Sequence, residues 1–198
     1  MTEQAPVIIY AESTPNPVSM KFVLNRLLIP GEGSSFDFRT KEKTSISPLA
    51  QKLFEFPFVS GVFIAANFVT VTQNESSEWH EIIPTIKDLI KNHVESGKPI
   101  VTETIAPLER MEQPVATTDL DQKIISLLDE YVRPAVEGDG GAIHFKSFHE
   151  GVVTVVLKGS CSGCPSSTLT LKQGIENLLR RMVPEVEEVV SETIEEPF

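Results

Sequence analysis

Two cysteines, Cys161 and Cys164, stand three positions apart and are the only cysteines in this chain of 198 residues. The apolar run 152–157 before them predicts a strand and helical spacing follows them, so we expect the pair at a strand-to-helix turn. Proline is favoured at the first helical position, so Pro165 predicts that Cys164 is the helix N-cap. Unpaired N–H groups and the helix dipole would lower the pKa of a thiol there, which predicts an exposed pair activated for metal binding or disulfide exchange.

Three chemistries compete for this pair. Thiol–disulfide exchange is one, because thioredoxin-like sites also place C-x-x-C at such a turn, although no aromatic residue stands just before Cys161. A zinc ion needs four ligands, and the histidines at hand, His144 and His149, are expected on the polar face of a strand and in a turn, where structural roles are more common. A 4Fe-4S cluster takes four cysteine thiolates, so two copies of this chain could complete one.

The cluster interpretation predicts a symmetric dimer with one cluster on its two-fold axis, held by two residues of each chain. A cluster so placed lies near solvent, which suits transfer better than permanent storage. The residues around the cysteines, Ser160, Ser162 and Gly163, are small enough for backbone N–H groups to approach the sulfur atoms. The segment 139–141 lacks the lysine and the spacing of a phosphate loop, and it predicts a tight turn that leads into a hairpin.

Periodicity in the second half predicts the order helix, hairpin, helix, strand, with one face of the hairpin apolar. The expected elements are a helix capped by Asp119 that stops near Arg133 and Pro134, strands over 142–148 and 152–158, a helix from the cysteines to Pro184, and a strand over 186–193. The expected inward residues of the hairpin are Ile143, Phe145, Val153, Val155 and Leu157.

The first half mixes strand and helix signals without a recognisable catalytic cluster. Its expected elements are strands over 7–10 and 21–29, a short helix that begins at Pro48 with Ser47 as N-cap, a hairpin over 62–72, and a helix over 77–94 that Pro84 must bend or restart. Three prolines and several threonines without periodicity mark 97–118 as a linker. The chain is therefore predicted to be α+β, with two small domains, 1–96 and 119–198, joined by a Pro/Thr-rich linker.

Charge and hydropathy limit the partners and the location. The net charge is −11 and both halves are acidic, so the phosphates of nucleic acids and of anionic membranes would be repelled. The longest apolar stretch, 58–71, is interrupted by polar residues and too short to cross a bilayer. The first ten residues lack the features of a secretory signal or a transit peptide, so we expect a cytoplasmic location, where the cysteines stay reduced.

Motifs in both halves resemble one known family. In the second half these are the segment 138–141 (GDGG) and the run 159–176 (GSCSGCPSSTLTLKQGIE), which resemble the C-terminal domain of NifU. In the first half they are 14–17 (TPNP) and 20–22 (MKF), which look like the signature of the N-terminal domain of Nfu-type iron–sulfur carriers. The resemblance covers nearly the whole chain apart from the linker.

The resemblance implies a carrier or scaffold and not an enzyme. A labile 4Fe-4S cluster, one per dimer, would be bound between two subunits and handed to apo iron–sulfur client proteins, after supply by an upstream cluster-assembly scaffold. By the same resemblance the cluster ligands are Cys161 and Cys164. The first domain would then serve partner recognition.

Overall fold

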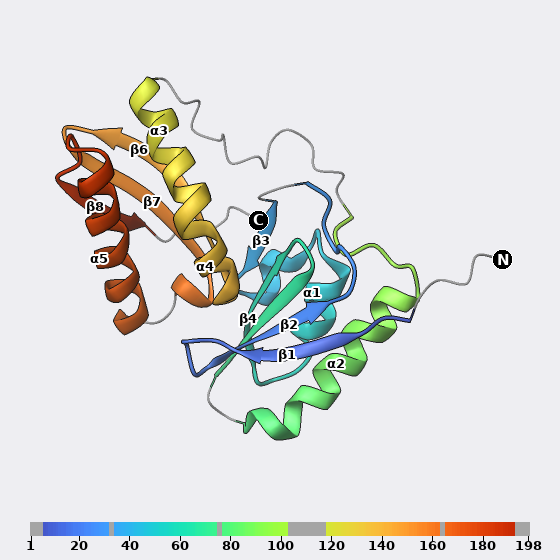
Figure 1. The fold of residues 1–198 in the computed structure, drawn as a ribbon. Coiled ribbons are helices and arrows are strands. Elements are labelled where there is room, and N and C mark those ends of the chain that lie inside the picture. Colours follow the sequence, from blue (N-terminus) through green and yellow to red (C-terminus); the bar gives the residue numbers. More distant parts are fainter. Residues whose placement is uncertain (1–5, 32–33, 75–76, 103–117, 163–164, 193–198) are drawn as a thin grey trace. The chain divides into compact units, whose positions relative to one another are not determined.

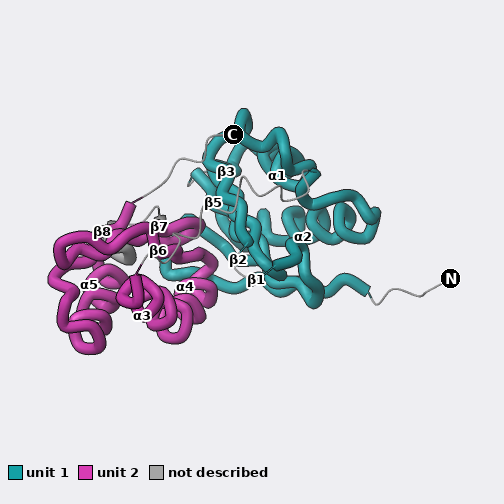
Figure 2. The backbone as a smooth tube through the Cα atoms, turned by 90° about the horizontal axis from the view of Figure 1, so that it is seen from above, with its two compact units in different colours: residues 1–104, 196–198 teal, residues 105–195 magenta. Residues whose placement is uncertain are grey.

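The structure, a computed structural model, describes residues 6–31, 34–74, 77–102, 118–162 and 165–192, and for 162 and 165–168 it describes the backbone alone. It divides into two compact units, which we call unit 1 (1–104 with 196–198) and unit 2 (105–195) (Figure 2). The predicted α+β class with two domains is confirmed. The domain boundaries at residues 96 and 118 stay predictions, because residues 103–117 of the expected linker lie outside the described residues.

Unit 1 is an antiparallel sheet of five strands in the order β1-β2-β5-β4-β3, with helices α1 and α2 on one face (Figure 1). Alternate residues of β2, including Phe22, point into the core between the sheet and these helices. The elements are β1 (Ile9–Ser13), β2 (Ser19–Leu24), β3 (Ser35–Phe38), the 3-10 helix η1 (Lys41–Thr44), α1 (Pro48–Leu53), β4 (Val59–Ala65), β5 (Phe68–Gln73) and α2 (Trp79–Glu95).

In unit 1, the start of α1 was predicted correctly from its capping residue, whereas the ends of β2 were not. Ser47 caps α1, since its hydroxyl accepts a hydrogen bond from the backbone N–H of Ala50 at 3.1 Å. The expected strand 21–29 is wrong at both ends, because β2 begins at Ser19 and ends at Leu24. Pro84 lies inside α2 and does not divide it into two helices.

Unit 2 is a three-stranded sheet in the order β6-β7-β8, in which β6 and β7 are antiparallel and β7 and β8 are parallel. A parallel pair needs a crossover connection, and α5 provides it between β7 and β8. The elements are α3 (Asp119–Leu127), a π-helical turn η2 (Leu128–Val132), α4 (Arg133–Gly138), β6 (Gly141–His149), β7 (Val152–Gly159), the 3-10 helix η3 (Ser160–Ser162), α5 (Pro165–Met182) and β8 (Glu188–Glu192).

The helices of unit 2 cover one face of this sheet, and the five residues expected to point inward from the hairpin are all in its core. The first helix differs from prediction at both ends. Thr118 and not Asp119 is the N-cap: the Thr118 hydroxyl accepts from the N–H of Asp121 at 3.1 Å, and the Asp121 carboxylate accepts from the N–H of Thr118 at 3.0 Å.

The same helix does not stop near Arg133 and Pro134, because η2 carries the chain directly into α4. Proline is tolerated at the start of a helix, where its missing N–H has no partner to lose, and Pro134 is in the first turn of α4. The consequence is that the chain reaches the turn 139–141 along a continuous helical path.

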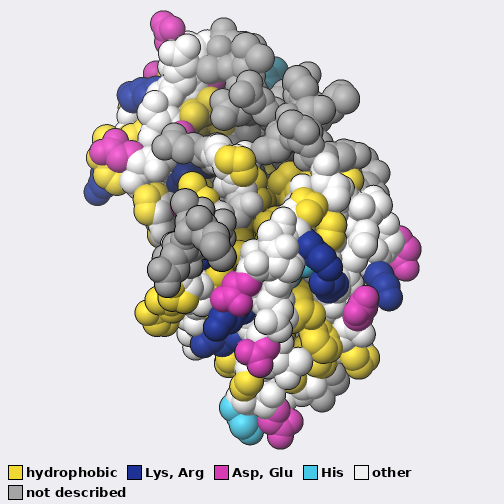
Figure 3. Space-filling view, turned by 90° about the vertical axis from the view of Figure 1, so that its right-hand side faces the viewer, with side chains coloured by type: hydrophobic (Ala, Val, Ile, Leu, Met, Phe, Trp, Pro, Cys, Tyr) yellow, Lys and Arg dark blue, Asp and Glu magenta, His cyan; other side chains and the backbone are white. Residues whose placement is uncertain are grey.

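On the face drawn in Figure 3, acidic and basic side chains are interspersed. Among the described helices, none has the length and apolar character that crossing a membrane would require.

Candidate functional site

The cysteine segment connects β7 to α5, so the predicted strand-to-helix turn is confirmed. Gly159 ends the strand with a φ of +68°, in the left-handed region that glycine adopts without strain. The 3-10 helix η3 follows, and α5 begins at Pro165, as the sequence predicts. Cys164 lies outside the described residues, so its position as N-cap stays a prediction.

Cys161 is turned into the core of unit 2, with 6% of its surface exposed. Burial, together with a smaller contribution from the charge of Asp139, raises the pKa of the Cys161 thiol to about 11, while a hydrogen bond with Ser160 acts in the opposite direction. The prediction of an exposed, activated thiol is therefore wrong for Cys161. The capping signal at Pro165 predicts where the helix begins, but it does not predict how deeply the side chain of Cys161 is buried.

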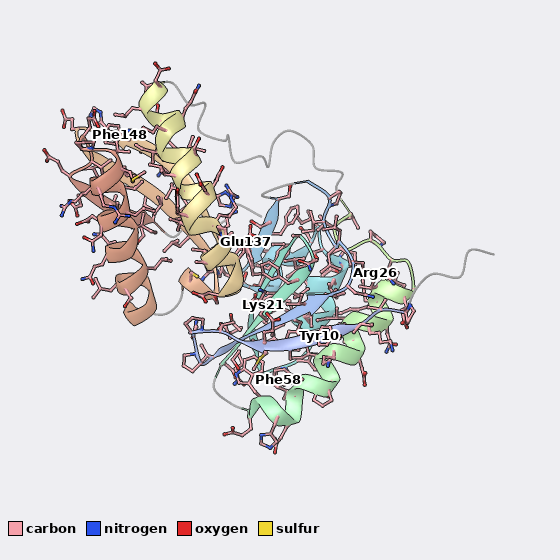
Figure 4. All side chains as sticks on the ribbon, in the orientation of Figure 1. Tyr10, Lys21, Arg26, Phe58, Glu137 and Phe148 are labelled. Carbon is pink, nitrogen blue, oxygen red and sulfur yellow. The ribbon has the colours of Figure 1, made fainter. Side chains whose placement is uncertain are left out.

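A turn that precedes β6 holds the residue before this cysteine. The hydroxyl of Ser160 donates to the carbonyl of Asp139 at 2.5 Å, and the backbone N–H of Ser160 donates to the carbonyl of Gly140 at 3.3 Å. Gly140 has a φ of +81°, as the predicted tight turn requires, and Glu137 lies in the last turn of α4, shortly before it (Figure 4). The segment 139–141 thus has a second role, as the support of the cysteine segment.

Gly141 leaves the space that Cys161 fills. A Cβ atom at position 141 would lie 2.6 Å from the carbonyl oxygen of Lys158 and 2.9 Å from Cys161 Sγ, closer than real Cβ atoms come. Sequence reasoning placed no functional role at Asp139, Gly140 or Gly141. The available signal was the glycine pair itself, which exceeds what one tight turn needs.

The two histidines weighed as zinc ligands do not gather with Cys161 in a ligand set. His144 follows the predicted alternation, because its neighbours Ile143 and Phe145 face the core. Burial, together with a smaller contribution from the charge of Lys158, lowers the pKa of His144 to about 4, so the imidazole is neutral at physiological pH. Within the described ranges, no three or more His, Cys, Asp or Glu side chains are arranged to hold a metal ion.

Fold and site together define a two-domain α+β protein that carries a C-x-x-C motif at the βα turn of its second domain. Comparison with known families agrees. Residues 9–97 match the family described as scaffold protein Nfu/NifU N terminal, and residues 124–190 match the NifU-like domain. The chain belongs to the Nfu/NifU family.

Individual relatives align along most of the chain. The protein named "NFU1 iron-sulfur cluster scaffold homolog, mitochondrial" from Homo sapiens is 39% identical over 188 residues, which cover 92% of this chain and 71% of that one. The protein of the same name from Drosophila sechellia is 38% identical over 190 residues, but this chain spans 64% of its length. A solution structure of a NifU-like protein from Saccharomyces cerevisiae is 26% identical, with a TM-score of 0.46 over 52% of this chain and 92% of that one.

Proposed function

We propose that this chain binds an iron–sulfur cluster as cargo and passes it to apo-proteins, without catalysing a reaction of its own. Family membership supports a role in cluster scaffolding, since relatives at 38–39% identity are named as iron–sulfur cluster scaffolds. The observation that carries the finer proposal is the cysteine count: the whole chain has two, both in one C-x-x-C motif. A 4Fe-4S cluster takes four thiolates, so we assign Cys161 and Cys164 of two copies to one shared cluster.

Delivery then proceeds by exchange of ligands. Incoming thiolates of a client replace Cys161 and Cys164 one at a time, and the two copies separate when their share of the ligands is gone. An upstream assembly scaffold supplies the cluster, and the first domain contributes to recognition of partners. The cytoplasmic location stays a prediction, as the relatives are named mitochondrial.

Thiol–disulfide exchange by the same motif is the alternative. A redox cysteine attacks as a thiolate, and its pKa is usually lowered for that purpose. Burial raises the pKa of Cys161, and this hinders attack on a disulfide and binding of a metal alike until the residue is exposed. Reduction of an insulin-type disulfide by the chain would favour the redox function, and we expect none.

Anaerobic reconstitution with iron and sulfide tests the proposal. We expect about four irons for every two chains, together with conversion of the loaded protein to a dimer. Native mass spectrometry reports metal content and oligomeric state in one measurement. A monomer with a full load of iron would rule out the shared cluster, and one zinc per chain in protein purified without air would favour the zinc site.

Single-ligand variants complete the test. Cys161→Ala and Cys164→Ala should each abolish cluster binding, because every chain would then contribute one thiolate in place of two. Far-UV circular dichroism of the cluster-free variants checks that they remain folded. Cluster binding retained by either variant would show that another group replaces the missing thiolate.

A further inference from the structure

Access to Cys161 is limited by its burial. A cluster shared by two copies must be reached from outside each chain, whereas 6% of the surface of Cys161 is exposed. If Cys161 is a ligand, as proposed above, the segment that carries it must move away from the core when the cluster binds. The contacts that hold this segment therefore control the thiol.

Ser160 makes two of these contacts. This residue is itself 2% exposed, and its hydroxyl donates to the carbonyl of Asp139 at 2.5 Å. The backbone N–H of Ser160 donates to the carbonyl of Gly140 at 3.3 Å, which joins the same segment to the same turn. Side chain and backbone of one residue thus connect the cysteine segment to a turn about twenty positions earlier in the chain.

The turn also shapes the space for the sulfur atom. Ser160 Oγ lies 3.8 Å from Cys161 Sγ, and Sγ occupies the space next to Gly141 where any other residue would place a Cβ atom. The same hydroxyl donates to the carbonyl of Asp139, so one side chain contacts both the turn and the sulfur atom. The closed position is therefore held by specific polar contacts as well as by apolar packing.

We propose that Ser160 is a positioning residue: its hydrogen bond to the carbonyl of Asp139, which we call the latch, keeps Cys161 in its buried, closed position. Breaking this hydrogen bond exposes the thiol. The inference rests on the proposed function only where it treats Cys161 as a ligand, because the latch belongs to the cluster-free chain. Release of the latch leaves the sheet intact, since the pairing of Gly141 with Gly159 does not involve the Ser160 hydroxyl.

Thiol labelling of a single-cysteine chain tests the latch. In a Cys164→Ser background, Cys161 is the chain's only cysteine, and its reaction with an aromatic disulfide reagent is followed at one pH through the coloured thiolate released. Ser160→Ala should raise the labelling rate about fivefold, the shift in a local opening equilibrium expected from the loss of one ordinary hydrogen bond. Ser126→Ala is the matched control, since it removes an exposed hydroxyl that donates to the carbonyl of Gln122 at 2.9 Å in the same unit.

Labelling at low concentrations of urea distinguishes local opening at Cys161 from unfolding of the whole unit. Local opening exposes little new surface, so the labelling rate should barely change below the unfolding transition. This holds for the chain with Ser160 intact, so the test stands even if Ser160→Ala does not fold. A steep rise of that rate with urea, or an equal acceleration by Ser160→Ala and Ser126→Ala, would overturn the latch.

The outcome is independent of the cluster experiment. Labelling uses protein without iron, so accelerated labelling by Ser160→Ala together with failed reconstitution of the unmodified chain would keep the latch and reject the carrier function. Successful reconstitution with unchanged labelling would do the reverse. In neither case does one result decide the other.

Discussion

Replacement of Gly141 by alanine tests whether the space beside Cys161 is as tight as the structure indicates. The added Cβ atom would meet the carbonyl oxygen of Lys158 at 2.6 Å and Cys161 Sγ at 2.9 Å, so backbone or sulfur must shift. The φ of Gly141 lies outside the left-handed region, so the cost comes from contact and not from backbone strain. Overpacking of this kind costs about 1–3 kcal/mol.

Part of this cost is offset in the unfolded chain. A change from glycine to alanine stabilises a protein by about 0.4–1 kcal/mol, because the unfolded chain loses conformational freedom. The expected net loss for Gly141→Ala is therefore about 1–2 kcal/mol. With a urea dependence of about 1–3 kcal/mol per molar, this lowers the midpoint for unit 2 by about 1 M.

The matched control is Gly174→Ala in the same unit. Gly174 lies inside α5, and a Cβ atom there would meet nothing within 4 Å. Alanine in a helix interior is favoured over glycine by up to about 1 kcal/mol, so this variant should be as stable as the original or more so. Urea unfolding followed by circular dichroism measures both variants, while the fluorescence of Trp79, the only tryptophan, follows unit 1. Equal midpoints for Gly141→Ala and Gly174→Ala would refute the tight contact.

Three further predictions concern caps and a buried histidine. Thr118→Ala removes one half of the capping box with Asp121 and should cost unit 2 about 1 kcal/mol, read from its urea midpoint. Ser47→Ala should cost unit 1 about 1–3 kcal/mol, because it leaves the N–H of Ala50 in α1 and the carbonyl of Ile100 without the Ser47 hydroxyl, and an unchanged fluorescence midpoint would contradict this. His93 is buried with its Nε2–H donating to the carbonyl of Pro99, and burial lowers the pKa of its imidazole. The unfolded chain then binds a proton that the folded chain does not, so unit 1 should lose stability as the pH falls below about 6.5, and His93→Gln should weaken that dependence.

Elements set by neighbouring residues were predictable from the sequence. Ser47 followed by Pro48 predicted the start of α1, and the spacing around the cysteines predicted a strand followed by a helix. The edge strand β3 was missed, because four residues, Ser35–Phe38, are too few for an alternation to stand out. Its structure depends on pairing with β4, a contact between residues far apart in the chain.

The same distinction applies to the site. The motif predicted which residues to consider, and the burial of Cys161 decided how one of them is presented. That burial depends on the turn 139–141, about twenty residues earlier, so no local pattern around the cysteine contains it. The sequence shows the two glycines of this turn, but the reason for Gly141 depends on the residues that lie across the hairpin from it, Gly159 and Cys161.

What lies opposite is determined by a bulge in the hairpin. Near its turn, β6 and β7 pair Ser147 with Thr154, a register that would continue to place Gly141 opposite Ser160. An irregularity between Phe145 and Ser147 shifts the register by one residue, so that Gly141 pairs with Gly159 instead. A shift of one residue changes the face on which every later pair lies, and this one keeps the hairpin's apolar residues on the core side all along both strands. The apolar pattern that fills the core of unit 2 therefore also sets two glycines against each other at the end of β7, where the space for Cys161 begins.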